Sequence, residues 1–177
     1  MSPSGQRGES WFTAVYQLHH PDVVRYGLRR LADPDAAGEL AQEVFVVAWR
    51  RREEVPEPSL PWLYGVARRL LANHRRAGRS RPAPLPLLDT DPLPVPGADA
   101  VIGLLDLRAA LAGLTEPDQE VLRLVGWEGL SLAELATALG CSRGTAAVRL
   151  YRARRRLTAA LRTPARPSPS RVAPVRI

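Results

Sequence analysis

Apolar side chains recur at helical spacing along most of the chain, and the strict alternation that a half-buried strand requires is missing. In the first half this spacing predicts a helix over residues 10–31, in which Pro21 can cause an interruption. A second helix is predicted over residues 35–52, capped by an aspartate at its start, and a third begins after Pro61. The apolar faces of the second and third helices are formed by Leu40, Val44, Val47, Ala48, Leu63, Val66, Ala67, Leu70 and Leu71.

The second half of the chain contains shorter apolar repeats bounded by capping residues. Ser131 opens the tetrapeptide SLAE, which is a capping-box pattern. Gly140 is suited to end that helix, and Ser142 to cap the next one. These signals predict helices at about residues 103–112, 117–126, 131–138 and 142–161. The whole chain is therefore predicted to be all-α.

Proline separates the two helical blocks. Six of the 17 prolines fall within fifteen residues, a density that excludes helix and favours extended chain. We therefore expect two small helical domains, residues 10–79 and 101–162, joined by a proline-rich linker over residues 80–100. A second proline-rich stretch predicts a disordered tail over residues 163–177.

Charge adds a second level of organisation, because it is positive overall and unevenly placed. The 25 basic residues exceed the 18 acidic ones, giving a net charge of +7, and every basic residue is an arginine. Residues 65–81 hold six arginines and residues 141–162 hold seven, with no acid in either stretch, whereas residues 33–57 hold seven acids. The chain thus offers two basic faces and one acidic helix, which indicates a polyanionic partner.

Several classes of function are excluded by what the sequence lacks. No apolar run approaches the ~20 residues of a membrane span, and the polar N-terminus does not resemble a signal peptide, so we expect a cytoplasmic protein without membrane insertion. No nucleophile clusters with a base, and no phosphate-binding glycine loop or metal-ligand spacing is present, so no catalytic residue, metal or cofactor is predicted. The single cysteine, Cys141, lies in a predicted turn. We interpret it as either a small buried thiol or a redox switch.

Residues 130–157 fit a helix-turn-helix, in which the second of two helices enters the major groove of DNA. Arginine is the usual partner of guanine there, because it can donate two hydrogen bonds to one base. The residues predicted to contact the duplex are Arg143, Thr145, Ala147, Val148, Arg149 and Arg152. The inward stripe of the same helix is Ala146, Leu150, Ala153 and Leu157. The alternative is a helical hairpin whose basic face is only solvated.

Three segments in this order resemble the sigma-70 family of bacterial RNA polymerase sigma factors. The sequence DAAGELAQEVFVVAWR at residues 35–50 is similar to the helix that binds core polymerase. The sequence PWLYGVARRLLANHRR at residues 61–76 is similar to the segment that opens and reads the −10 element. The sequence LTEPDQEVLRL at residues 114–124, with the helix-turn-helix, is similar to the domain that reads the −35 element. The two-domain order resembles the small extracytoplasmic-function (ECF) group.

The resemblance implies a role for particular residues. It places five residues at the core polymerase: Glu39, Leu40, Gln42, Glu43 and Phe45. It places seven residues at the −10 element, next to a base pocket near residues 56–61. They are Trp62, Tyr64, Arg68, Arg69, Asn73, Arg75 and Arg76. It assigns the −35 element to the helix-turn-helix residues. Plainer alternatives are a solvated i, i+4 pair or a di-metal carboxylate pair for Glu39 and Glu43, and core packing for Trp62 and Tyr64.

Four positions depart from the family pattern and affect the expected promoter contacts: Gly38, Arg69, Asn73 and Ala147. The predicted function is a sigma factor that directs promoter-specific initiation and aids melting. Its predicted partners are core RNA polymerase, promoter DNA and, by analogy alone, an anti-sigma factor. The alternative is a stand-alone helix-turn-helix regulator, which has no need of the acidic helix face.

The predicted linker is long enough for two promoter elements. Its twenty or so residues span ~25 Å as a flexible coil and up to ~60 Å as an extended polyproline chain. Elements ~25 base pairs apart lie ~85 Å apart along the duplex. Two domains of ~25–30 Å each, with this linker between them, cover that distance.

Overall fold

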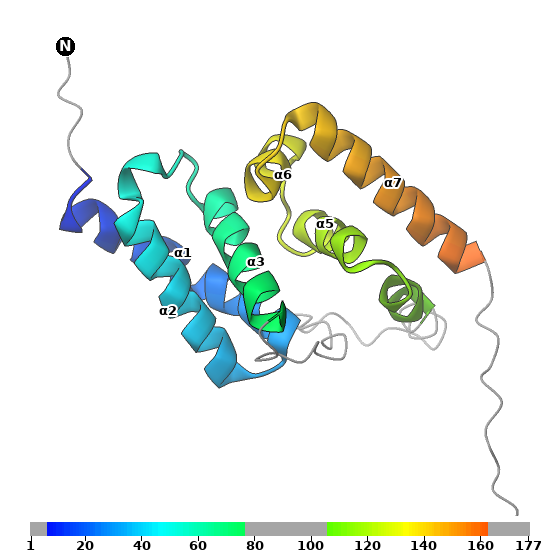
Figure 1. The fold of residues 1–177 in the computed structure, drawn as a ribbon, viewed down its shortest axis with the longest axis horizontal. Helices are drawn as coiled ribbons and strands as arrows, with labels where there is room; N and C mark the ends of the chain where they lie inside the picture. The colour runs from blue at the N-terminus through cyan, green and yellow to red at the C-terminus, as the bar shows by residue number, and fades with distance from the viewer. Residues whose placement is uncertain (1–6, 77–105, 163–177) are drawn as a thin grey trace, which may run out of the picture.

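The structure, a computed structural model, describes residues 7–76 and 106–162, and every regular element in these two ranges is a helix. The elements are α1 (Glu9–Leu31), α2 (Pro34–Arg50), η1 (Arg52–Glu54), α3 (Leu60–Arg76), a helical stretch at residues 106–112, α5 (Glu116–Gly126), α6 (Leu132–Leu139) and α7 (Arg143–Arg162). Figure 1 shows them as two groups of helices, which confirms the all-α prediction. The predicted linker, residues 80–100, and the predicted tail, residues 163–177, lie outside the described residues.

The first domain is a bundle of α1, α2 and α3. α1 continues through Pro21, so the interruption that this proline can cause does not occur. Val15 before the proline and Val23 and Tyr26 after it are buried in the same core, and this packing outweighs the backbone hydrogen bond that proline lacks. No helix within residues 7–76 and 106–162 combines the length and apolarity needed to cross a bilayer.

The start of α2 is set by a capping residue, and its end by the turn that follows. The Asp33 carboxylate accepts hydrogen bonds from the N–H groups of Asp35 at 2.9 Å and Ala36 at 3.2 Å, so the helix begins directly after it. α2 ends at Arg50 rather than at residue 52, because the chain tightens into the 3₁₀ turn η1. Both ends therefore differ from the sequence prediction by one or two residues.

The second domain contains the predicted helix-turn-helix, formed by α6 and α7. Ser131 and Glu134 form a complete capping box: the Ser131 N–H donates to the Glu134 carboxylate at 2.8 Å, and the Glu134 N–H donates to Ser131 Oγ at 3.3 Å. Gly140 takes the left-handed conformation, φ +63°, that ends α6. Ser142 Oγ then accepts from the Thr145 N–H at 3.2 Å and starts α7. These predicted signals are confirmed.

Each domain buries the apolar faces that the sequence pattern marks. Leu40, Leu63 and Val44 are fully buried in the first domain, and Leu124 and Leu135 in the second. On α7 the predicted inward stripe is confirmed: its two alanines are fully buried and its two leucines are half-buried.

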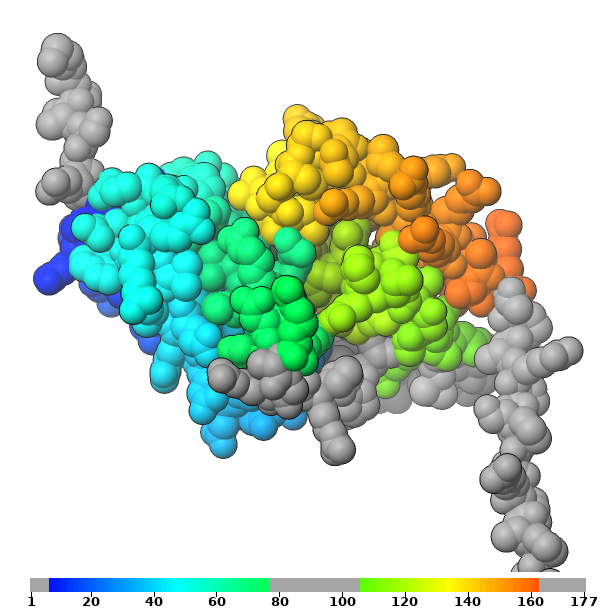
Figure 2. Space-filling view, in the orientation of Figure 1, coloured from blue at the N-terminus to red at the C-terminus, as the bar shows by residue number. Residues whose placement is uncertain are grey.

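The two domains also pack against each other, which the sequence did not predict. α6 lies against α3, as the space-filling view in Figure 2 shows. At Gly65 of α3 the two helices approach so closely that an added Cβ atom would lie 2.8 Å from the backbone carbonyl oxygen of Ala138. Only glycine permits this approach, because any side chain would collide with the backbone of α6.

Candidate functional site

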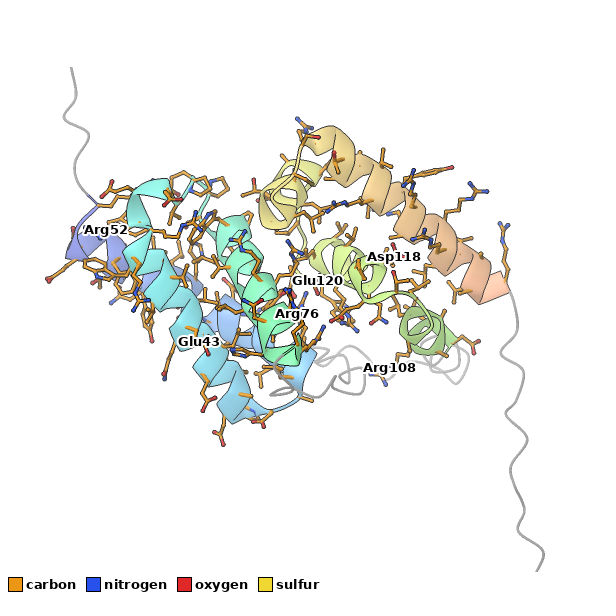
Figure 3. All side chains as sticks on the ribbon, in the orientation of Figure 1. Glu43, Arg52, Arg76, Arg108, Asp118 and Glu120 are labelled. Atoms are coloured by element: carbon orange, nitrogen blue, oxygen red, sulfur yellow. The ribbon has the colours of Figure 1, made fainter. Side chains whose placement is uncertain are left out.

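α7 lies on the outer side of the second domain (Figure 1), and its arginines are exposed. Of its predicted DNA-contacting residues, Ala147 is half-buried, and the exposed ones are Arg143, Thr145, Val148, Arg149 and Arg152. Within the described part of the chain, none of these three arginines forms a salt bridge, whereas Arg156 pairs with Asp118 of α5 at 2.6 Å. Figure 3 labels Asp118 on the side of α5 that faces α7. The unpaired arginines suit the base edges and phosphates of a duplex.

The residues predicted for the −10 element fall on two sides of α3. The more exposed side carries Trp62, Arg69, Asn73 and Arg76. The Arg51 guanidinium lies 5.8 Å from the centre of the Trp62 ring. Partial burial, and then the positive charges of Arg68 and Arg51, lower the pKa of Arg69. This side therefore combines an aromatic ring with crowded cationic groups, as single-stranded nucleic acid requires.

The other side of α3 faces the second domain. Tyr64 is buried and stacks on Tyr26 of α1, with ring centres 5.2 Å apart and an angle of 24° between the planes. Arg68 donates a hydrogen bond to the backbone carbonyl oxygen of Leu139 in α6 at 3.4 Å. Arg75 forms an ion pair with Glu116 at the start of α5. In this arrangement the three side chains are occupied by protein.

The predicted polymerase-binding residues of α2 also differ in exposure. Leu40 and Phe45 are buried in the core of the first domain. The side chains that reach the surface are Glu39, Gln42 and Glu43. Glu43, labelled on α2 in Figure 3, lies 3.2 Å from His74 Nε2 of α3.

An aromatic groove between α1 and α2 was missed in the sequence. It has a volume of about 640 Å³ and is lined by Glu9, Phe12, Thr13, Tyr16, Gln42, Phe45, Val46 and Trp49. Tyr16, Val46 and Trp49 are exposed although they are large and apolar or aromatic. The aromatic pairs Phe12/Tyr16 and Phe45/Trp49, each at i, i+4 spacing, were the signal that could have revealed it. Gln42 joins this groove to the acidic face of α2.

A second feature missed in the sequence is a set of charged residues that joins the two domains; we call it the interdomain cluster. It consists of Tyr26, Arg29 and Arg30 of α1, Glu120 of α5, and Glu128 of the loop before α6. Arg30 donates to both carboxylate oxygens of Glu120, at 3.0 and 3.1 Å, and to Glu128 at 2.8 Å. Figure 3 labels Glu120 on α5, beside the first domain.

The electrostatics of the interdomain cluster follow from its burial. The Arg30 side chain is 1% exposed and that of Glu128 is 2% exposed. Burial opposes the ionisation of Glu120, but the charge of Arg30 and hydrogen bonds from Arg30 and Tyr26 outweigh it and lower the pKa of Glu120. Burial raises the pKa of Tyr26 well above its ordinary value, so its hydroxyl stays protonated and donates to Glu120 at 2.8 Å. Arg30 and Glu120 therefore form a charged pair that is held by several hydrogen bonds.

The second domain has an exposed basic helix in a helix-turn-helix, and the first has a basic helix and an acidic helix face. This combination is typical of a two-part DNA-binding protein. Comparison with known proteins identifies the family. Residues 15–81 match the family described as Sigma-70 region 2, and residues 104–157 match Sigma-70, region 4.

Individual relatives agree with this assignment. The ECF RNA polymerase sigma factor SigL of Mycobacterium tuberculosis is 31% identical over 153 residues, covering 81% of this chain and 85% of the relative. The ECF sigma factor SigC of the same species is 33% identical over 164 residues, covering 88% and 84%. The sigma factor RpoE of Bartonella quintana, solved in complex with the anti-sigma factor NepR, shares the fold, with a TM-score of 0.59, 24% identity and coverage of 86% and 98%.

The chain belongs to the sigma-70 family of RNA polymerase sigma factors, and within it to the ECF type. It is a DNA-binding transcription initiation factor, and sigma factors regulate transcription rather than catalyse a reaction themselves.

Proposed function

We propose that this sigma factor divides its contacts among three surfaces: the α2 face for core polymerase, α3 for the −10 element and α7 for the −35 element. The observation that carries the proposal is that the exposed acidic face of α2 and the unpaired basic face of α7 occur in one chain, on different domains. A stand-alone regulator needs only the α7 face. A protein that recruits polymerase needs both.

The polymerase surface consists of the polar residues Glu39, Gln42 and Glu43, with the adjoining aromatic groove. Carboxylates pair with arginines or lysines of a partner helix, and exposed rings such as Trp49 supply the apolar area that stabilises an interface. Leu40 and Phe45 support this surface from beneath, since both are buried.

The −35 surface is the outer face of α7. Arg149 and Arg152 lie one turn apart on the exposed side, which suits bidentate contacts with bases or phosphates. Val148 is 48% exposed and suits the methyl group of a thymine. Thr145 and the first-turn N–H groups suit a backbone phosphate.

The −10 surface is α3, with Trp62 as the stacking platform and Arg69, Asn73 and Arg76 around the melted strand. The loop at residues 56–61 directly precedes Trp62 and is the place for a base pocket. Arg68 and Arg75 of the same helix add cationic groups beside this surface, and Tyr64 stacks on Tyr26 of α1.

We also propose where this protein acts and which kind of partner controls it. The protein acts in the cytoplasm, where core polymerase is found. Because the similar RpoE was solved with an anti-sigma factor, a partner of that kind is proposed for this chain as well.

The experiment that tests the proposed function is transcription in vitro. Core polymerase without any sigma factor is given a pooled library of promoter fragments, with and without the purified protein. Transcripts with defined starts that depend on the protein are expected, and alignment of their upstream DNA supplies the two elements. Duplex binding without any defined transcript would favour the stand-alone regulator and contradict the proposal.

A further inference from the structure

We infer that Arg7, two residues before α1, is a positioning residue for the −10 base pocket proposed above. Its guanidinium holds the loop between η1 and α3 by backbone carbonyl oxygens, and so keeps residues 56–58 in place for an extruded base. The inference rests on the pocket role proposed for residues 56–61, and it adds a residue that acts on the base through the loop.

Arg7 connects the start of α1 to the turn that follows α2. Its Nη1 donates hydrogen bonds to the carbonyl oxygen of Arg52, at 2.8 Å, and to that of Val55. Its backbone N–H donates to the Glu53 carboxylate at 3.1 Å. These acceptors are 45–48 residues away in the sequence, and Figure 3 labels Arg52 beside the start of α1. One residue thus attaches η1 and the residue after it to α1.

The loop after η1 has little backbone hydrogen bonding of its own. Pro56 and Pro58 have no N–H group to donate. In the described part of the chain, the turn hydrogen bond from the Val55 N–H to the Arg52 oxygen is long, at 3.4 Å, and the next one along the chain is donated by Leu63, inside α3. Contacts from outside the loop must therefore hold its shape.

The two ends of the loop are anchored, and its tip is exposed. Val55 and Ser59 are each 2% exposed, whereas Glu57 and Pro58 lie at the surface. Arg7 acts at the first of these anchors, because it bonds the Val55 carbonyl oxygen. It therefore fixes the direction in which the tip leaves the first domain.

The bonds to carbonyl oxygens contribute more than the ion pair that Arg7 also makes. Its Nη2 lies 3.8 Å from Glu57, whose side chain is 65% exposed, and a pair this exposed contributes little. The bonds to Arg52 and Val55 are half-buried and have a charged donor, which makes them stronger than neutral hydrogen bonds. The centre of the Trp11 ring, 4.8 Å from Arg7 Cζ, helps to keep the guanidinium in place. The loop is therefore held mainly by its backbone, and its tip side chains stay available to a base.

The same turn also carries a partner of the stacking platform. Arg51, the residue before η1, lies 5.8 Å from the centre of the Trp62 ring and donates a hydrogen bond to Glu54. Because Arg7 is bonded to this turn, it affects both parts of the proposed pocket, the loop and the ring. An extruded base gains most from groups that are already in place, since binding then costs no ordering of the loop.

The test measures whether the effect of Arg7 depends on one base. Three proteins of residues 1–177 are used: wild type, Arg7→Ala, and the control Arg25→Ala, which removes an exposed arginine of α1 that pairs with Asp22 at 3.2 Å. Circular dichroism checks that all three are folded. Each is combined with core polymerase, and fluorescence anisotropy reports binding to a labelled single strand that carries the −10 element of a promoter identified by transcription. The strand is used intact and with the base removed at each position in turn.

With the intact strand, Arg7→Ala is expected to bind about tenfold more weakly than wild type, the size of one lost base contact. With the base removed at the position that the pocket reads, wild type and Arg7→Ala should bind equally, because no base is left to position. At every other position the difference should persist. General destabilisation of the fold does not give such a coupling between one residue and one base. Arg25→Ala should match wild type on every strand.

Two results would overturn the inference. An Arg7→Ala affinity equal to that of wild type on the intact strand would show that the loop does not need this anchor. A loss of the same size on every strand, whichever base is missing, would show that Arg7 contacts the DNA backbone or stabilises the fold in general. Failure of the proposed function has a different signature: the wild type would give no defined transcript, or its affinity would depend on no base of the strand.

Discussion

Glu120 illustrates how single residues of one domain depend on the other. Its carboxylate lies on α5, but three of its hydrogen bonds come from Tyr26 and Arg30 of α1. These donors favour the ionised form and hold its pKa below the ordinary value of 4.5. The ionisation of one side chain is thus linked to contact between the domains.

The linkage predicts a dependence on acid. Because contact with Arg30 and Tyr26 lowers the pKa of Glu120, its contribution to the contact between the domains is fully present above about pH 4.5 and is lost as the pH falls toward the depressed pKa. The charged or titratable groups that face it are Arg30, Tyr26, Arg123 and Glu128. Scattering from the free protein between pH 7 and pH 3 should show lengthening in this acid range.

Glu120→Gln supplies the comparison for the acid prediction, because an amide does not titrate. Its maximum dimension should be longer at pH 7 and should change less across the range. A wild-type dimension that is independent of pH while the fold persists would contradict the role given to Glu120.

The helix ends are encoded locally, and the second domain shows this most clearly. The capping box of Ser131 and Glu134 starts α6, and hydrogen bonds from Ser131 lower the pKa of Glu134. Gly140 ends the helix and Ser142 starts the next one. Four residues over twelve positions therefore set the geometry of the helix-turn-helix.

Ser131→Ala tests this cap. Loss of the side-chain acceptor should destabilise the protein by about 0.5–2 kcal/mol, because the Glu134 N–H then lacks its partner. Urea unfolding, followed by circular dichroism, measures the change in the free energy of unfolding. Ser10→Ala, at an exposed position in α1, should change it by less than about 0.5 kcal/mol. Equal effects of both substitutions would show that the cap carries no special stability.

Arg149→Ala tests the exposed face of α7. If Arg149 makes a bidentate base contact, its loss should weaken binding to a −35 duplex by about 1–3 kcal/mol and relax specificity at one base pair. Arg162, at the end of the same helix, is the matched control, since it is exposed and lies several turns beyond the recognition face. Anisotropy titrations at fixed salt give both affinities. An unchanged affinity of the Arg149→Ala variant for the duplex would show that this side of α7 is not the recognition face.

At the scale of the whole molecule, the proposed polymerase surface on α2 and the proposed −35 surface on α7 lie on different domains. Glu43→Arg reverses a charge on the α2 face and should weaken association with core polymerase about tenfold or more. Binding to a −35 duplex should not change, because α7 is on the other domain. Competition against labelled wild-type protein for core polymerase measures the first effect.

The contact between Glu43 and His74 requires a control in this experiment. His74→Ala removes the partner at 3.2 Å but keeps the carboxylate, so it should retain most of the polymerase affinity. Equal losses in Glu43→Arg and His74→Ala would assign the effect to packing of α2 on α3 rather than to a polymerase contact.

The sequence predicted the features that depend on neighbouring residues, and it missed the features that depend on contacts between distant residues. Helices, caps and the inward stripe of α7 follow from periodicity and from capping residues within a few positions. Arg30 and Glu120 are 90 residues apart, and nothing in the local pattern of either marks it as buried. Tyr64 could equally stack on a base or pack in a core, and its stacking on Tyr26, which is distant in the sequence, decides its position in this structure.

The outward position of α7 has a consequence for experiments that map this protein on a genome. If α7 binds the −35 element as proposed, chromatin immunoprecipitation would recover every molecule that holds a −35 duplex, whether or not the −10 strands have been separated. The number of occupied sites would then exceed the number of active promoters. Permanganate, which oxidises unpaired thymines, would mark only those sites where the strands have been separated.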